Sequence, residues 1–264
     1  MRAKILSALM LSCCLLGFAA NAGAQVTYHG GPVIVSAKVV NIFWGPSFVT
    51  GGADFLYAQT LIGFRNQFGT NHEYNVITQY YQIVGGVRQF IQLSNLAAGT
   101  TDWFDTSLPP TNVTDTIARN EIRAYLATHA ADSSTIYQLF LPASSYSSVG
   151  TATSCGGPAL SFCAYHSTFS LSSGSTAVKY AVQPYESCSA CQVSGWTAAQ
   201  NEEHFVAYTT RASVTDPLRN AWYDNATGIE MDDKCLWSPA PFLDGGFGYP
   251  YEWSNLAGGC VKWR

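Results

Sequence analysis

The sequence has few charged residues and, beyond residue 24, no long apolar run. Only 11% of its 264 residues are Asp, Glu, Lys or Arg, against about a quarter in an average domain, and 13 basic residues stand against 17 acidic ones. A chain with this acidic balance is not expected to bind nucleic acid. No stretch after residue 24 approaches the length of a membrane span, so none is expected in the mature chain.

Several catalytic signatures are also missing. The sequence has no Gly-x-Ser-x-Gly elbow and no phosphate-binding glycine-rich loop, which removes the usual signals for two large enzyme classes. The acidic pairs Glu202–Glu203 and Asp232–Asp233 could serve glycan cleavage only if they faced each other across a cleft, so we interpret them as solvated acidic faces. No internal repeat and no long linker divides the chain, which favours one domain over residues 25–264.

The first 24 residues have the order of a cleavable signal peptide. Arg2 and Lys4 precede an apolar run, and an Ala-Gly-Ala cleavage signal ends at residue 24. Cleavage would leave 240 residues with 11 basic and 17 acidic side chains, a net charge of −6. We therefore expect an exported protein, either periplasmic or extracellular.

Six of the eight cysteines lie beyond the signal peptide, all in the C-terminal half. An even number of cysteines in an exported chain favours disulfides, and the pairing we prefer is 235 with 260, 155 with 163 and 188 with 191. The alternative is a structural zinc site, because two cysteines have the two-residue spacing of a zinc knuckle. The six are Cys155, Cys163, Cys188, Cys191, Cys235 and Cys260.

Hydrophobic periodicity predicts an α/β or α+β fold, with a mixed sheet flanked by helices. The pattern at Thr197 and Gln200 matches a capping box and marks the start of one helix. Strands are predicted over 38–44, 74–82, 135–141, 163–171 and 177–184, and helices over 53–68, 115–131 and 197–214.

Long strings in the C-terminal third resemble the bacterial branch of the EXORDIUM-like, or phosphate-induced, secreted family. The most specific are 215–224 (TDPLRNAWYD) and 228–235 (GIEMDDKC). Shorter similar strings lie at 29–33 (HGGPV), 78–80 (TQY), 162–167 (FCAYHS) and 180–185 (YAVQPY), so the resemblance spans nearly the whole mature chain.

The resemblance implies a zincin-like domain whose helix before Thr-Asp-Pro carries His-Glu-x-x-Glu. Such a helix would grip zinc with its i and i+4 side chains and use the Glu as general base. This sequence departs from that pattern: the three positions hold Tyr208, Thr209 and Ala212. Neither Thr nor Ala can replace the expected groups, so the resemblance predicts a non-catalytic relative with no bound zinc.

A rearranged metal site is the alternative hypothesis. His204 lies one turn before Tyr208 on the predicted helix, and the acids Asp216, Glu230 and Asp233 follow downstream. A His, a Tyr and carboxylates can bind a metal and support a hydrolase or peptidase.

The remaining histidines receive structural interpretations. We expect His166 to be a structural residue beside a disulfide, and His72 and His129 to lie on the surface. The expected partner is a cell-wall or other extracellular ligand. We expect no nucleic-acid partner and no membrane span in the mature chain. The biological role is not predicted.

Overall fold

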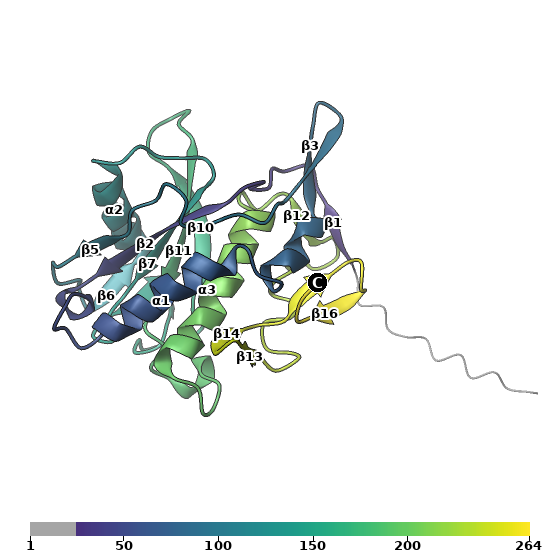
Figure 1. Cartoon of the computed structure of the whole chain (residues 1–264). Coiled ribbons are helices and arrows are strands. Elements are labelled where there is room, and N and C mark those ends of the chain that lie inside the picture. The colour runs from purple at the N-terminus through teal and green to yellow at the C-terminus, as the bar shows by residue number, and fades with distance from the viewer. Residues whose placement is uncertain (1–24) are drawn as a thin grey trace, which may run out of the picture.

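A five-stranded mixed sheet forms the centre of the molecule (Figure 1), in the order β10–β11–β7–β2–β5. The computed structural model describes residues 25–264, so the predicted signal peptide lies outside the described residues. Four strands run parallel, and only the edge strand β10 runs antiparallel to its neighbour. This sheet and its helices confirm the predicted mixed α and β fold class. The strands are β2 (Lys38–Trp44), β5 (Trp103–Asp105), β7 (Thr135–Phe140), β10 (Tyr165–Ser170) and β11 (Ala177–Gln183).

Helices cover both faces of the sheet. α1 (Phe55–Phe68) and α3 (Ala198–Thr215) pack on the face that Val39 presents, whereas α2 (Asp115–Leu126) packs on the face that Val40 presents. Successive side chains of a strand point to opposite faces, so neighbouring valines of β2 enter different cores. Figure 1 shows α1 and α3 crossing in front of the sheet, with α2 behind it.

The three helices match their predicted ranges to within two residues, except at the end of α2. Thr197 and Gln200 form the predicted capping box at the start of α3. α2 ends at Leu126, about one turn before the predicted residue 131, because Thr128 and His129 contact the carbonyl oxygen of Tyr125 with their side chains. Such local bonds occupy the carbonyl that a further helical turn would use.

The strand predicted over 74–82 is wrong for most of its length. Residues Tyr74–Gln79 form the 3₁₀ helix η2, and a strand begins only at Tyr81. The amide N–H of Tyr74 donates to Asn71 Oδ1, and Thr78 Oγ1 donates back to the carbonyl of Asn75. These side-chain bonds favour a tight turn over the extended chain that the β-branched and aromatic composition predicted.

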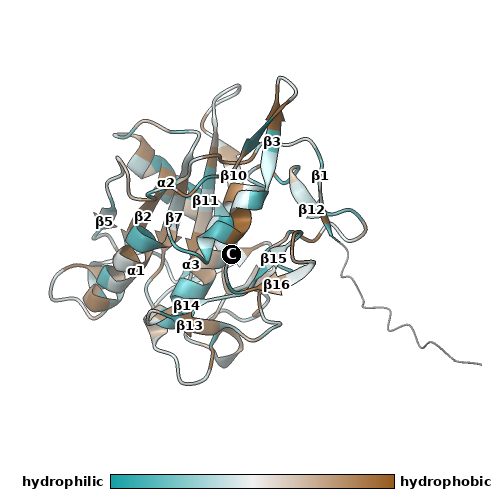
Figure 2. Cartoon of the chain, turned by 45° about the vertical axis from the view of Figure 1, so that its right-hand side comes forward, coloured by the Kyte–Doolittle hydropathy of each residue, from teal (hydrophilic) through white to brown (hydrophobic). Residues whose placement is uncertain are grey.

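Short two- and three-stranded sheets surround the central one. The hairpin of β3 (Tyr81–Val84) and β4 (Val87–Phe90) projects from the body, and its apolar residues appear brown in Figure 2. No helix among the described residues is both long and apolar enough to cross a membrane. The other short elements are β1 (Val26–Tyr28), β6 (Asn112–Thr114), β8 (Tyr146–Val149), β9 (Ala152–Thr153), β12 (Trp222–Asp224), β13 (Phe242–Asp244), β14 (Phe247–Tyr249), β15 (Glu252–Ser254), β16 (Gly259–Val261), and the 3₁₀ helices η1 (Pro46–Phe48) and η3 (Ser189–Cys191).

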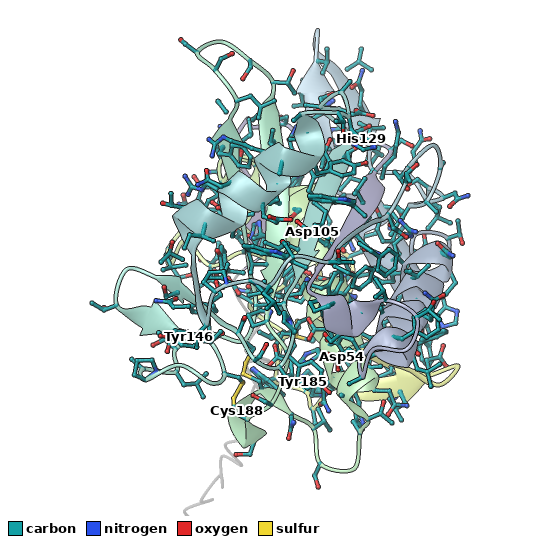
Figure 3. The ribbon with its side chains drawn as sticks, turned by 90° about the vertical axis from the view of Figure 1, so that its left-hand side faces the viewer. Asp54, Asp105, His129, Tyr146, Tyr185 and Cys188 are labelled. Atoms are coloured by element: carbon teal, nitrogen blue, oxygen red, sulfur yellow. A yellow bond between two sulfur atoms is a disulfide. The ribbon has the colours of Figure 1, made fainter. Side chains whose placement is uncertain are left out.

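Three disulfides tie the C-terminal half together. The bond between Cys235 and Cys260 confirms one predicted pair. The other two predicted pairs are wrong, because the structure joins 155 to 188 and 163 to 191. The fold places η3 beside the segment 155–163, so each cysteine meets a partner on the other segment, with Cα atoms 5.4 and 5.6 Å apart. One of these bonds appears in yellow beside the label of Cys188 in Figure 3.

Candidate functional site

A pocket of about 430 Å³ lies against α3. Its lining is mostly apolar, and the sequence-predicted Tyr208 supplies one of its few polar atoms. Small-molecule sites are typically concave and apolar with a few placed polar groups, so this pocket is the strongest candidate site. The lining residues are Leu160, Ser161, Phe162, Cys163, Ala164, Ala190, Cys191, Phe205, Tyr208, Leu236 and Trp237.

Two fixed elements hold the walls of this pocket. Phe205 and Tyr208 are three residues apart on α3, a spacing that puts both side chains on one face of the helix. The disulfide between Cys163 and Cys191 fixes the facing wall. Trp237 is 41% exposed, so a large apolar surface meets water at the rim and is available to a ligand.

The polar end of the pocket is a hydrogen bond from the Tyr208 hydroxyl to Asp233 Oδ1, 2.8 Å long. Burial and the negative charge of Asp233 raise the pKa of Tyr208 well above its ordinary value. The phenol therefore stays neutral at physiological pH. Its proton is directed at Asp233, which leaves the oxygen lone pairs free to accept a hydrogen bond.

Beside this pair, His166 of β10 contacts Glu230, with 2.9 Å between Nε2 and Oε2. Their side chains are only 10% and 12% exposed. Burial would lower the pKa of His166, but the hydrogen bond and charge of Glu230, with a further contribution from Asp233, raise it above its ordinary value. His166 is thus the partner of a predicted site residue rather than simply a histidine beside a disulfide.

Asp216 ends α3 and has a backbone role. Its Oδ1 accepts hydrogen bonds from the amides of Asn220 and Ala221 at 2.6 and 2.7 Å. Burial and the charge of Glu230 raise its pKa to about 6, although the bond from Ala221 acts in the opposite direction. This carboxylate closes the turn after the helix.

His204 points elsewhere. Its Nε2 lies 3.0 Å from the carbonyl oxygen of Leu236, and its ring packs edge-on against Trp237 at 4.9 Å. Burial lowers the pKa of His204 to about 3, so the imidazole is neutral. Within residues 25–264, no group of three His, Cys or carboxylate ligand atoms within 4.8 Å of one another includes His204. The structure brings Tyr208, Asp233 and Glu230 together. His204, which the rearranged metal site also requires, is not in a ligand group with them among the described residues.

The other two positions at which the sequence departs from His-Glu-x-x-Glu face the protein interior. Thr209 Oγ1 donates to the carbonyl of Phe205 and accepts from Gln183 Nε2 of β11 at 2.7 Å. Ala212 is completely buried. Of the three motif positions, only Tyr208 lines the pocket.

Three acids that we interpreted as solvated are buried, so that interpretation is wrong. Glu202, Glu203 and Asp232 are at most 1% exposed. Glu202 and Glu203 are buried because α3 packs against the sheet, α1 and the C-terminal strands at once. Asp232 is buried beside Arg211 of the same helix. Burial raises the pKa of Glu202 and of Glu203 to about 8.

The carboxyl ends of the parallel strands form a second polar region, seen in Figure 3 with Asp54, Asp105 and Tyr185 labelled. Open α/β sheets often bind ligands at this edge. Here, however, Glu186 and Glu202 beside Tyr185 are 1% and 0% exposed, and burial followed by the charge of Glu202 raises the pKa of Glu186. These carboxyl groups are inaccessible to a ligand from solvent, and their burial affects the stability of the fold.

The cysteines do not provide the zinc site considered from sequence. The sulfur atoms of Cys155, Cys188 and Cys191 lie within 4.8 Å of one another because two disulfides are neighbours. Zinc binds thiolates, and sulfurs joined in disulfides are not thiolates.

Sequence reasoning missed the pocket aromatics Phe205 and Trp237, which have no local pattern to distinguish them from core residues. The string 162–167 was a usable signal, since it contributes both a pocket wall and His166.

Comparison with known proteins gives no match to a family model, to a curated protein or to a solved structure. The interpretation of the pocket accordingly depends on its own residues and geometry.

Proposed function

We propose that this is an exported, non-catalytic binding protein whose pocket on α3 takes a small ligand with an aromatic or apolar body and one hydrogen-bond donor. The observation that carries the proposal is the pocket itself, with apolar walls and Tyr208 hydrogen bonded to Asp233 at its polar end. The predicted signal peptide and the three disulfides support export.

The chemistry of α3 supports a role without catalysis. The general-base position of the family motif is Thr209, whose hydroxyl is engaged by Phe205 and Gln183. A threonine in this setting cannot take a proton from water as a glutamate would. His204 is buried behind the pocket wall, where its Nε2 lies against the carbonyl oxygen of Leu236, and it does not itself line the pocket.

The polar end of the pocket favours a donor over an anion. The Tyr208 oxygen can accept a hydrogen bond, and Asp233 adds negative charge next to it. A ligand carboxylate placed there would be repelled, whereas an amine or hydroxyl would be attracted. The apolar walls, with the exposed Trp237 at the rim, would bury the body of the ligand.

Two probes with the same aromatic body test this charge preference. We expect phenethylamine to bind at one site in isothermal titration calorimetry, and phenylacetate to bind roughly tenfold more weakly or not at all. Trp237→Ala and Tyr208→Phe should each weaken phenethylamine binding several-fold. Trp263→Ala removes another exposed tryptophan, outside the pocket, and should leave binding unchanged.

Two results would contradict the proposal. One is equal affinity of the Trp237→Ala variant and the unmodified protein for phenethylamine, or no binding at all. The other is a stoichiometric zinc ion that is lost on His204→Ala or Tyr208→Phe, together with peptidase activity, because that would favour the rearranged metal site.

A further inference from the structure

A second cluster of ligand-type side chains lies outside the pocket lining, where the turn after α1 meets the β13–β14 hairpin. His72 Nε2 is 2.8 Å from Glu73 Oε1 and 2.9 Å from Asp244 Oδ2. All three ligand atoms lie within 4.8 Å of one another. An imidazole nitrogen and two carboxylate oxygens thus converge on one point from two segments of the chain.

The hydrogen bonds within this cluster leave one buried carboxylate oxygen, Glu73 Oε1, without a donor. The Nε2 of His72 can carry one proton, and its hydrogen bond is made to Asp244. Glu73 Oε1 is left without a hydrogen-bond donor, although the Glu73 side chain is only 1% exposed. A buried carboxylate oxygen without a donor is costly, and this one is aimed at the imidazole nitrogen and the second carboxylate.

Neighbouring residues hold the three side chains in place. The amide of Arg264 donates to the carbonyl of His72, and the ring of Trp263 packs edge-on against the imidazole at 5.3 Å. Asp244 precedes Gly245 and Gly246, whose φ values of 56° and 91° form the tight turn of the hairpin. The ligand atoms therefore belong to ordered segments on both sides.

We propose that His72, Glu73 and Asp244 bind one divalent transition-metal ion, for which Zn²⁺ is the test ion. An imidazole nitrogen with carboxylate oxygens is a common donor set for zinc, with metal–ligand bonds of about 2 Å that separate adjacent ligands by roughly 3 Å. The two measured separations already match this spacing. Binding displaces the proton on Nε2 of His72 and gives Glu73 Oε1 a cationic partner.

The metal would join the turn after α1 to the C-terminal hairpin, segments about 170 residues apart in sequence. His72 is 53% and Asp244 40% exposed, so the ion can enter from solvent and keep a water ligand. None of the three residues lines the pocket on α3, so this site is independent of the proposed function.

Calorimetric titration of the metal-free protein with ZnCl₂ at pH 7 tests the proposal. We expect one equivalent of zinc to bind, with proton release and a rise in Tm. Asp244→Asn, a change at a half-exposed hairpin position, and His72→Ala should each weaken binding at least about tenfold. His129→Ala removes a surface histidine stacked on Tyr125 and serves as the matched control, with unchanged binding.

The absence of a one-equivalent binding event overturns the proposal. So does zinc affinity that survives both Asp244→Asn and His72→Ala but is lost on His166→Ala, since the ion would then bind at the Glu230 cluster. Phenethylamine binding by the Asp244→Asn variant reports separately on the pocket.

Discussion

Arg211 of α3 and Glu252 of β15 form an ion pair with no exposed surface on either side chain, with 2.6 Å between Nε and Oε2. Asp232 Oδ1 approaches the same guanidinium nitrogen at 3.4 Å, and Arg211 also donates to the carbonyl of Pro250. A single buried cation therefore fixes the helix to two C-terminal segments.

Replacing Arg211 should strongly destabilise the fold. Arg211→Met leaves Glu252 and Asp232 buried without their counter-charge, which typically costs about 3–5 kcal/mol. Urea unfolding followed by tryptophan fluorescence measures the loss, and Arg88→Ala on the exposed β4 strand is the control, with a change under about 0.5 kcal/mol. Adding Glu252→Gln to Arg211→Met should recover part of the stability. No recovery in the double variant would contradict the charge explanation.

The buried carboxyl groups predict that stability decreases as pH rises from about 4.5 to about 8. Glu202 accepts a hydrogen bond from the Tyr57 hydroxyl, and burial raises its pKa from 4.5 to about 8. Between these values the folded state holds a proton that the unfolded state has lost. The stabilisation is thus complete below pH 4.5 and is lost as pH rises through about 8.

Glu202→Gln removes this titration while keeping the shape of the side chain. Calorimetric Tm values from pH 5 to pH 9 should fall less steeply for the variant. The loss in free energy of unfolding across this range should be smaller by roughly 1–3 kcal/mol. Glu203 retains its own raised pKa, so the slope decreases but does not vanish. Parallel curves for variant and unmodified protein would show that Glu202 is ionised in the folded state.

Gly248 of β14 marks a close backbone approach to the start of α3. An added Cβ would lie 2.1 Å from the carbonyl oxygen of Gln200 and 2.7 Å from the ring of Trp196. The amide of Gly248 also donates to the buried Glu203 at 2.8 Å. Gly248→Ala should therefore push the hairpin away from the helix and cost about 1–3 kcal/mol or more.

Gly63, in the middle of α1, is the matched control because a Cβ there meets no atom within 4 Å. Gly63→Ala should stabilise the protein by about 0.5–1 kcal/mol through helix propensity. Opposite shifts of the unfolding midpoint are expected for the two variants. A neutral Gly248→Ala would mean that the hairpin does not pack on α3 as described.

Local patterns were sufficient to locate most of the regular structure. The apolar run 38–44 and the capping box at Thr197 identified β2 and the start of α3, since both depend on neighbours in sequence. The same reasoning was wrong at Tyr74–Gln79, where side-chain bonds to nearby backbone outweigh β propensity.

Part of the candidate site was also visible in the sequence. The sequence predicts Tyr208 and Asp233 as candidate site residues, and a hydrogen bond joins them in the structure. Thr209 and Ala212, where the sequence departs from the expected pattern, are helix positions that face the interior. The aromatic pocket walls were not visible, because a tryptophan or phenylalanine in sequence does not reveal whether it packs in a core or lines a cavity.

The sequence by itself determined the class of fold, the even set of cysteines and the positions of the main helices, all of which follow from composition and short-range periodicity. Only the tertiary structure decided that Cys155 pairs with Cys188, that Glu202 and Glu203 are buried, and that Asp244 meets His72. Each of these depends on which distant segments pack together. Burial, pairing and ligand geometry are properties of that packing, and no local pattern encodes them.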